Sequence, residues 1–264
     1  MPQFCVVSRE LHAGKKWRRF DGYSFAPKEA LAPIVVAELA SATLCLPLGF
    51  SEQAGRYALV AVLSPTPGRN MFVGPDGRWL APYIPACFRG YPFRLLPKQG
   101  TDEVVLCVDA DSNLISEGGS EGEDFFDQDG NISPALKAVF DFLLAIEQSR
   151  SATDLAVSAL AETAVIQPWS IKLKTPQGEQ AIGGLHRIDE AALGALTNEA
   201  FLKLRQAGAL PIAYMQPLSR TQLQMFESLE KLQAQLAPRS VPANLPESLD
   251  RLFELPSDDI IRFH

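Results

Sequence analysis

The 264-residue chain has little of what usually marks an enzyme or a metal protein. Its histidines and cysteines are few and widely spaced: His12, His186, His264, Cys5, Cys45, Cys87 and Cys107. The sequence contains no CxxC pair, P-loop or dinucleotide-binding GxGxxG. Because enzymes usually display a paired acid, base or nucleophile signal, these absences favour a non-catalytic protein. We expect no cofactor and no metal site.

The cysteines also bear on the compartment. They lie in apolar surroundings and far apart in the sequence, so buried free thiols are expected rather than disulfides or zinc ligands. Free thiols are typical of a reducing compartment. Residues 1–17 lack the long apolar run of a secretory signal. A cytoplasmic location is therefore expected.

Positive charge is in deficit. With 24 Lys and Arg against 31 Asp and Glu, the formal net charge is -7. This argues against nucleic-acid binding, because such binding depends on neutralising phosphates. The exception is the basic run 15–19, KKWRR. A run this short is usually a solvated loop, and binding of an anionic partner there is the minor alternative.

Long hydrophobic runs are scarce as well. The segment Ala30–Phe50 has the length of a membrane span and carries one charge, Glu38. Pro33 lies near its start, and no second span exists to pair the carboxylate, so we predict no membrane span. A globular helix is expected instead, ending before Pro47, with three inward residues: Ile34, Val35 and Leu39.

Hydrophobic periodicity and turn signals place elements along the rest of the chain. The expected strands are Tyr57–Leu63, Glu103–Val108, Trp169–Thr175, Gln180–Ile188 and Leu210–Met215, the third and fourth forming a hairpin. The expected helices begin at Ser133, at a Ser151–Asp154 capping box, at Thr197 and at Ser219, with Ser219–Leu236 the longest. Because strands follow one another without crossover helices, we predict an α+β fold. It has a mixed or mainly antiparallel sheet, helices packed on it and a more helical C-terminal half.

One domain is expected over residues 1–237. The segment 238–264 is rich in proline and contains a small amphipathic stretch around Leu249, Leu252 and Phe253. Such a tail seldom folds alone, so we expect it to dock on its own domain or on a neighbouring copy, the latter giving a homodimer.

Residues 109–129 form an acidic, glycine-rich segment that leads into Asp127-Gln128-Asp129-Gly130-Asn131. This run partly matches a calcium loop, but Ile132 and Ala138 occupy the positions of the EF-hand glycine and final glutamate. A turn is favoured, followed by a helix capped by Ser133. Whether the segment binds a cation stays open.

The stretch Arg69–Phe93, RNMFVGPDGRWLAPYIPACFRGYPF, concentrates aromatic side chains among prolines and glycines. Residues 74–77 predict a turn between two short strands, and Pro85 and Gly90 bracket a helical turn over Ala86–Arg89. The aromatic side chains are interpreted as core. The alternative is the wall of a ligand groove, with polar ends presented from an apolar surface.

Arg89 is the residue that packing explains least, because a buried arginine needs a carboxylate or backbone carbonyls as partners. His186 could act as a general base, although a lone histidine in a hairpin is more often packed or on the surface. The candidate ligand- or partner-binding residues are Trp79, Tyr83, Arg89, Tyr91 and His186.

The same stretch resembles the SapC family of bacterial proteins. The family's G-x-W-x-x-x-Y-x-P run and R-x-YPF ending match Gly77, Trp79, Tyr83, Pro85, Arg89, Tyr91, Pro92 and Phe93, and its LFDxxG element matches Phe126, Asp127 and Gly130. The resemblance covers roughly Phe4–Leu236. One departure is Gly90, where the family often carries a second basic residue. The resemblance implies surface-layer or outer-membrane functions. It is not to the peptide-transporter permease of the same name, which would need several membrane spans.

Two functional hypotheses follow. The first is a non-catalytic accessory or binding protein that recognises a protein or peptide partner connected with surface-layer or outer-membrane functions. The second is an enzyme or small-molecule binder with a pocket near Arg89 and His186. The first is favoured because no catalytic constellation stands out in the sequence.

Overall fold

The computed structural model describes residues 3–98, 100, 103–118, 121–175 and 178–236. Its strands are β1 Phe4–Val6, β2 Lys15–Trp17, β3 Leu31–Pro33, β4 Leu48–Gln53, β5 Arg56–Val62, β6 Phe93–Pro97, β7 Val104–Asp109, β8 Ile115–Glu117, β9 Glu123–Asp124, β10 Ile166–Thr175 and β11 Gly178–Ile188. Its helices are α1 Arg9–His12, α2 Leu39–Thr43, α3 Ala86–Arg89, α4 Pro134–Glu162, α5 Glu190–Gly194, α6 Asn198–Gln206, α7 Leu210–Ser219 and α8 Met225–Leu236. Short 3-10 segments are η1 Val36–Glu38, η2 Ala110–Ser112 and η3 Arg220–Gln224.

The strands form antiparallel sheets. The largest has the order β10-β11-β4-β5-β3, and two three-stranded sheets have the orders β1-β7-β6 and β8-β2-β9. Every strand pairing in the described chain is antiparallel. The predicted hairpin is confirmed, since β10 pairs with β11 from Ile166 opposite Ile188 to Thr175 opposite Gly178. The α+β class is therefore confirmed.

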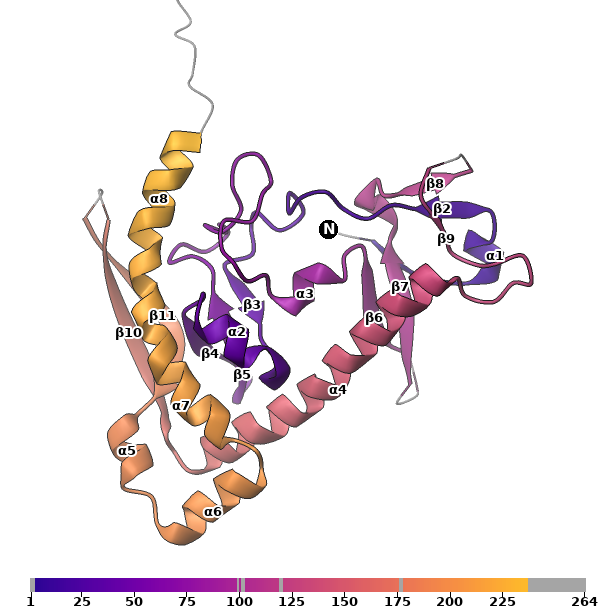
Figure 1. Ribbon diagram of the computed structural model, residues 1–264. Helices are drawn as coiled ribbons and strands as arrows, with labels where there is room; N and C mark the ends of the chain where they lie inside the picture. The colour runs from indigo at the N-terminus through magenta and orange to yellow at the C-terminus, as the bar shows by residue number, and fades with distance from the viewer. Residues whose placement is uncertain (1–2, 99, 101–102, 119–120, 176–177, 237–264) are drawn as a thin grey trace, which may run out of the picture.

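Helix α4 joins two hydrophobic cores. Figure 1 shows it running diagonally from beside β6 and β7 toward the foot of β5 and α7. Near its start, Leu136 is buried in a small core together with Trp17 and Phe93. Near its end, Ala156 and Leu160 are buried in the large core that also contains the inner residues of β4 and β5. One helix of 29 residues thus ties the two cores together.

The helix start predicted at the Ser151–Asp154 capping box is wrong, because α4 passes through these residues without interruption. A threonine side chain can satisfy itself inside a helix by bonding to the carbonyl one turn back. Thr153 donates its hydroxyl to the Ser149 carbonyl at 2.6 Å. The same oxygen accepts the Val36 backbone N–H at 2.8 Å, so this polar residue fastens η1 to α4.

The helix within the segment Ala30–Phe50 is shorter than predicted. It forms β3, η1, α2 and the first residues of β4, so only Leu39–Thr43 is α-helical. Ile34 and Val35 are buried as expected, but they precede the helix. In the part of the chain that the structure describes, no helix is both long and apolar enough to cross a membrane.

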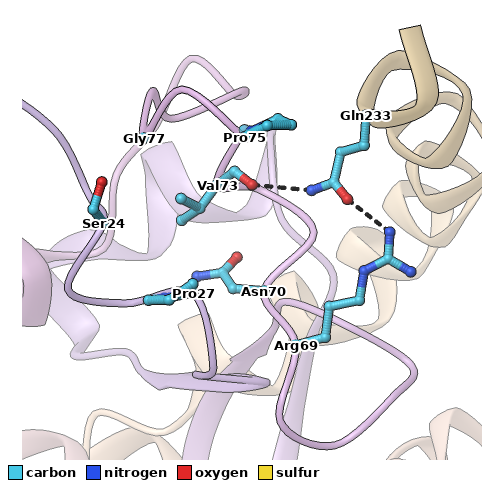
Figure 2. Close-up of a pocket in the computed structure, with 9 residues that line it drawn as sticks. Ser24, Pro27, Arg69, Asn70, Val73, Pro75, Gly77 and Gln233 are labelled. Atoms are coloured by element: carbon cyan, nitrogen blue, oxygen red, sulfur yellow. Dashed lines mark hydrogen bonds between the residues drawn. The ribbon is translucent and has the colours of Figure 1, made fainter. Parts of the chain in front are cut away.

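Helix α8 follows η3 and is the last helix of the described chain (Figure 1). Gln233 connects it to the loop that follows β5, as Figure 2 shows. The Gln233 amide nitrogen donates to the carbonyls of Met71 at 2.8 Å and Val73 at 3.0 Å, while its oxygen accepts from Arg69 Nη2 at 2.6 Å. Both ends of one amide therefore hold α8 against this loop.

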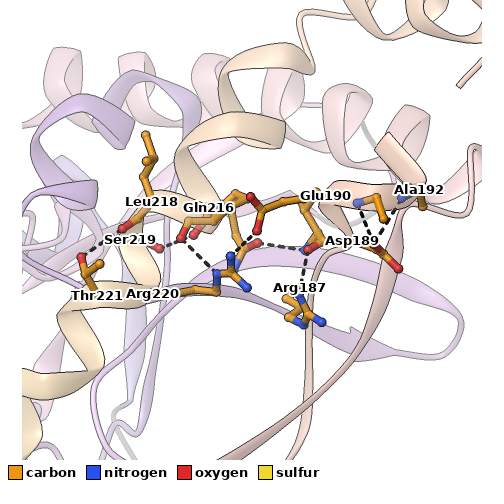
Figure 3. Close-up of polar contacts among 12 residues, drawn as sticks. Arg187, Asp189, Glu190, Ala192, Gln216, Leu218, Ser219, Arg220 and Thr221 are labelled. Atoms are coloured by element: carbon orange, nitrogen blue, oxygen red, sulfur yellow. Dashed lines mark hydrogen bonds and ion pairs between the residues drawn. The ribbon is translucent and has the colours of Figure 1, made fainter. Parts of the chain in front are cut away.

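The strand predicted at Leu210–Met215 is wrong, because these residues begin helix α7. The helix is fixed to the large sheet by two buried polar residues that follow the apolar run (Figure 3). Gln216 accepts the Ile188 N–H and donates to the Leu48 carbonyl, both at 2.9 Å. Ser219 accepts the Leu48 N–H at 2.9 Å.

That contact also explains why Ser219 does not cap a helix of its own. Its hydroxyl is used by β4, and the chain continues from α7 through η3 into α8. The longest helix is therefore α4 rather than Ser219–Leu236, since α8 has 12 residues and α4 has 29.

The basic run and the acidic segment meet in the sheet β8-β2-β9. Strand β2 lies between β8 and β9, and Lys15 pairs with Glu117 at 3.0 Å and Lys16 with Asp124 at 3.2 Å. The basic run is thus in part a strand rather than a solvated loop. The predicted turn at residues 127–131 is confirmed by a hydrogen bond from the Asp127 N–H to the Asn131 carbonyl. The proline-rich segment 238–264 lies outside the described residues.

Candidate binding surface

The aromatic stretch folds as a turn, a short helix and a strand. The predicted hairpin is reduced to a single bridge between Val73 and Trp79, closed by a hydrogen bond from the Gly74 N–H to the Arg78 carbonyl. The predicted helical turn is confirmed as α3, which begins after Pro85 and ends before Gly90. The Tyr91–Pro92 peptide bond is cis, and the chain then enters edge strand β6.

The rings of this stretch join those of the segment 20–25 in one network. Phe25 stacks on Tyr91 with ring centroids 3.9 Å apart, and Tyr23 meets Trp79 edge to face at 5.6 Å. Phe20 lies against Tyr23, Phe25 and Tyr91. We call the following half-buried residues, with exposed Arg89, the aromatic surface: Phe20, Tyr23, Phe25, Trp79, Tyr83 and Tyr91.

Beneath this surface the buried carboxylate of Glu38 holds three hydrogen bonds. Oε1 accepts the Tyr83 hydroxyl at 2.7 Å and the Ala86 N–H at 2.6 Å, and Oε2 accepts the Val35 N–H at 3.1 Å. Glu38 is only 4% exposed, so these donors replace the water that the carboxylate has lost. It therefore attaches the start of α3 and the Tyr83 side chain to η1.

Arg89 is exposed, so it does not need the carboxylate or backbone carbonyls that a buried arginine would require. Its guanidinium lies over the rings of Tyr83 and Phe142, 5.7 and 5.1 Å from their centroids, and Nη2 donates to the Tyr83 hydroxyl at 3.5 Å. Within the described chain Arg89 forms no salt bridge. It approaches Glu38 only through the tyrosine between them.

Burial and nearby carboxylates keep the tyrosine hydroxyls protonated. Burial, with the hydrogen bond to Glu38, raises the pKa of Tyr83 well above its ordinary value. Burial and the neighbouring Asp109 raise the pKa of Tyr91 to about 12, and its hydroxyl donates to Asp109 Oδ2 at 3.2 Å. Both phenols are therefore hydrogen-bond donors at neutral pH rather than bases.

The thiol on α3 is not activated by its proximity to Glu38. The nearest thiol on α3 is Cys87, and burial together with the charge of Glu38 raises its pKa to about 12. A thiol that stays protonated is a poor nucleophile. In the described residues no group of three or more His, Cys, Asp or Glu side chains is placed to hold a metal ion.

His186 is not brought to the other candidate residues. It lies on β11 opposite Phe50 of β4, with Nε2 3.5 Å from Glu52 Oε2 and its ring edge to face with Tyr57. Its Nδ1 is buried and has no hydrogen-bond partner in the described chain. None of these contacts involves Arg89 or Tyr83, so the two halves of the predicted pocket do not converge.

A cavity does open beside the aromatic surface, where the structure places no predicted site residue. It has a volume of about 370 Å³ and lies between the loop after β5 and α8 (Figure 2). Its lining residues are Ser24, Pro27, Arg69, Asn70, Val73, Gly74, Pro75, Gly77 and Gln233.

Comparison with protein families identifies the family of the chain. The SapC family model matches residues 7–226, which is most of the 264-residue chain. The chain belongs to the SapC family. Comparison with curated proteins and with solved structures gives no significant match.

The SapC motif residues can now be given structural roles. Gly77 has φ +80°, and a Cβ there would meet the Ser24 hydroxyl at 2.5 Å, so both the turn and the close approach require glycine. Trp79 donates its indole N–H to the Tyr83 carbonyl at 2.7 Å. At Gly90, a Cβ would lie 2.6 Å from the Leu143 side chain of α4.

The sequence-based predictions missed three parts of the aromatic surface and its support. Glu38 was interpreted as an unpaired charge in an apolar run, although a lone carboxylate in such a run indicates buried polar partners. Segment 20–25, FDGYSF, was also missed; the close spacing of its three aromatic residues is the one feature that could have pointed to it. Phe142 of α4, which lies under Arg89, gave none that distinguishes it from a core residue.

Proposed function

We propose that this SapC-family chain is a non-catalytic binding protein that recognises a protein or peptide partner through the aromatic surface. The observation that carries the proposal is Arg89, an exposed guanidinium held on Tyr83 and Phe142 with no carboxylate of the described chain bonded to it. Tyrosine, tryptophan and arginine are the residues that most often dominate binding energy at protein interfaces.

The chemistry of the surface suggests the chemistry of the partner. An arginine that stacks on aromatic rings keeps its N–H fork for a planar acceptor, and a carboxylate matches that fork in two parallel hydrogen bonds. The half-buried rings of Tyr23, Phe25 and Tyr91 offer apolar area beside it. We therefore propose a partner that presents an aspartate or glutamate next to apolar side chains.

The cellular setting is part of the same proposal. The family resemblance suggests a bacterial protein whose partner is connected with surface-layer or outer-membrane functions, and the composition favours work in the cytoplasm. The competing hypothesis, a pocket shared by Arg89 and His186, lacks support because His186 contacts Glu52 and Tyr57 instead.

The test is capture of partners from native bacterial lysate on the immobilised chain, followed by affinity measurement with the recovered protein. Arg89→Ala should weaken binding about 30-fold or more, since truncating an interface hot spot costs about 2 kcal/mol or more. Arg205→Ala is the matched control, because Arg205 is exposed on α6, and it should bind as the wild type does. A partner that binds equally well to Arg89→Ala, with the fold intact, would refute the proposal.

A further inference from the structure

The cavity beside the aromatic surface has the size of a ligand site. Its volume of about 370 Å³ falls in the range of pockets that hold small molecules. Three segments far apart in the sequence build it: residues 24–27, the loop after β5 and helix α8, as Figure 2 shows. Gln233 keeps these walls in place through its hydrogen bonds to Arg69, Met71 and Val73. The cavity is thus part of the fixed structure.

Most polar groups of the lining are already occupied. The Asn70 side chain donates to the Ala26 carbonyl and accepts the Phe72 N–H, so it is a structural residue. The Gln233 amide is used at both ends. Asp76, in the turn beside the lining, is neutralised by Arg78 at 2.6 Å. These groups hold the walls and leave little capacity for a ligand.

Two lining groups have capacity left. Arg69 is half-buried, and its one hydrogen bond in the described chain is the neutral contact from Nη2 to Gln233. A guanidinium has five N–H donors, so one bond leaves the others available. The Ser24 hydroxyl has no hydrogen bond in the same part of the chain, and Figure 2 shows it at the opposite side of the cavity. A half-buried cation without an anionic partner points to an anionic ligand.

We propose that this cavity binds a carboxylate attached to a small apolar body, with Arg69 as its charged contact. A carboxylate needs few donors, whereas a phosphate dianion would leave several of its oxygens unbonded against a single guanidinium. The Ser24 hydroxyl, across the cavity, would bond a polar atom of the ligand's body. The remaining lining side chains, Pro27, Val73 and Pro75, supply an apolar wall for the body of the ligand. This site is separate from Arg89 and goes beyond the proposed function.

The test is a titration followed by amide NMR on the full chain. The probe is N-acetylvaline, its uncharged control is N-acetylvalinamide, and inorganic phosphate is the competing anion. The acid should cause saturable shifts at Asn70, Gly74, Gly77 and the Gln233 side-chain amide, and the other two probes should cause none. A tripeptide ending in a free valine carboxylate distinguishes the sources. Tighter binding than N-acetylvaline assigns the site to peptide C-termini, and weaker or equal binding assigns it to small acids.

Variants locate the contact. Arg69→Met should weaken N-acetylvaline binding tenfold or more, on the order of a charged hydrogen bond, and Arg205→Met on α6 is the matched control that should leave it unchanged. Because Arg69 also helps to hold α8, Ser24→Ala serves as a second variant that preserves that contact. It should weaken binding about two- to tenfold.

The inference would be overturned by any of three results: no saturable shift with a carboxylate, equal binding of acid and amide, or tighter binding of phosphate. Its failure is distinguishable from failure of the proposed function. Arg69→Met should retain the Arg89-dependent partner, and Arg89→Ala should retain N-acetylvaline binding.

Discussion

Replacement of Glu38 by glutamine should destabilise the protein by about 2–3 kcal/mol, although the two side chains have nearly the same shape. The carboxylate accepts three hydrogen bonds, from Tyr83, Ala86 and Val35. An amide can place its oxygen toward Tyr83 and Ala86, but its NH₂ group then faces the Val35 N–H, donor against donor. The variant therefore keeps two of the three bonds, both without charge.

The magnitude follows from these contacts. Losing the charge weakens each of the two retained bonds by about 1 kcal/mol, and a buried N–H left without an acceptor costs about 1–3 kcal/mol. The smaller desolvation penalty of a neutral amide offsets part of the sum. Glu38→Ala should cost about 3–5 kcal/mol because it leaves three buried donors unpaired. Tyr83→Phe, which removes one donor and keeps the carboxylate, should cost about 1–2 kcal/mol.

The assay is urea unfolding followed by tryptophan fluorescence. The expected order of stability is wild type, Tyr83→Phe, Glu38→Gln and then Glu38→Ala. The double variant Tyr83→Phe with Glu38→Gln should show a coupling free energy, because the two side chains share a hydrogen bond. A loss below about 0.5 kcal/mol for Glu38→Gln would refute the reasoning, because that is the range of surface substitutions.

Two further predictions test other contacts. Burial, together with the charge of Lys15, holds the pKa of His12 below its ordinary 6.5 despite the Ser8 carbonyl, so the folded state resists protonation. Stability should be complete above about pH 6.5 and should decline as the pH falls toward the folded-state pKa; His12→Gln should lose this dependence, and parallel pH profiles of unfolding would contradict it. Gly90→Ala should destabilise by about 1 kcal/mol by crowding Leu143, and a Leu143→Ala background should relieve the effect; an additive double variant would count against that contact.

Local rules predicted the elements whose limits are set by a few neighbouring residues. Ser133 and Pro134 correctly began α4, and the Ser133 hydroxyl accepts the Leu136 N–H at 3.1 Å. Thr197 capped α6 as expected, and Gly208 follows its end with φ +68°. These signals hold because a cap is a contact over three or four residues, which the sequence displays directly.

The failures were elements decided by contacts between distant segments. The run Leu210–Met215 is apolar enough for either a strand or a buried helix, and periodicity alone does not separate them. The hydrogen bonds of Gln216 and Ser219 to strands more than twenty residues away favour the helix. The sequence displays Gln216 and Ser219, but it does not display which distant residues they contact.

The candidate site divides in the same way. Trp79, Tyr83, Arg89 and Tyr91 gather because one short stretch carries them, whereas His186 was grouped with them on chemistry alone and lies beside Glu52. Within the described chain, Arg89 contacts two rings and a hydroxyl rather than the carboxylate or backbone carbonyls expected as its partners. The helical turn α3 directs Phe88 inward and leaves Arg89 exposed.

Glu38 connects the stability of the chain to the proposed binding. Its side chain is almost fully buried, and it fixes Tyr83 and the first turn of α3 by hydrogen bonds. Tyr83 and α3 in turn hold the Arg89 guanidinium over the Tyr83 ring. Ordering an arginine side chain costs conformational entropy, and a side chain already ordered loses less of it on binding. A buried carboxylate can therefore raise affinity for a partner that it never contacts. The aromatic surface is then preorganised for binding, because Glu38 makes it rigid and Arg89 presents its positive charge to the partner.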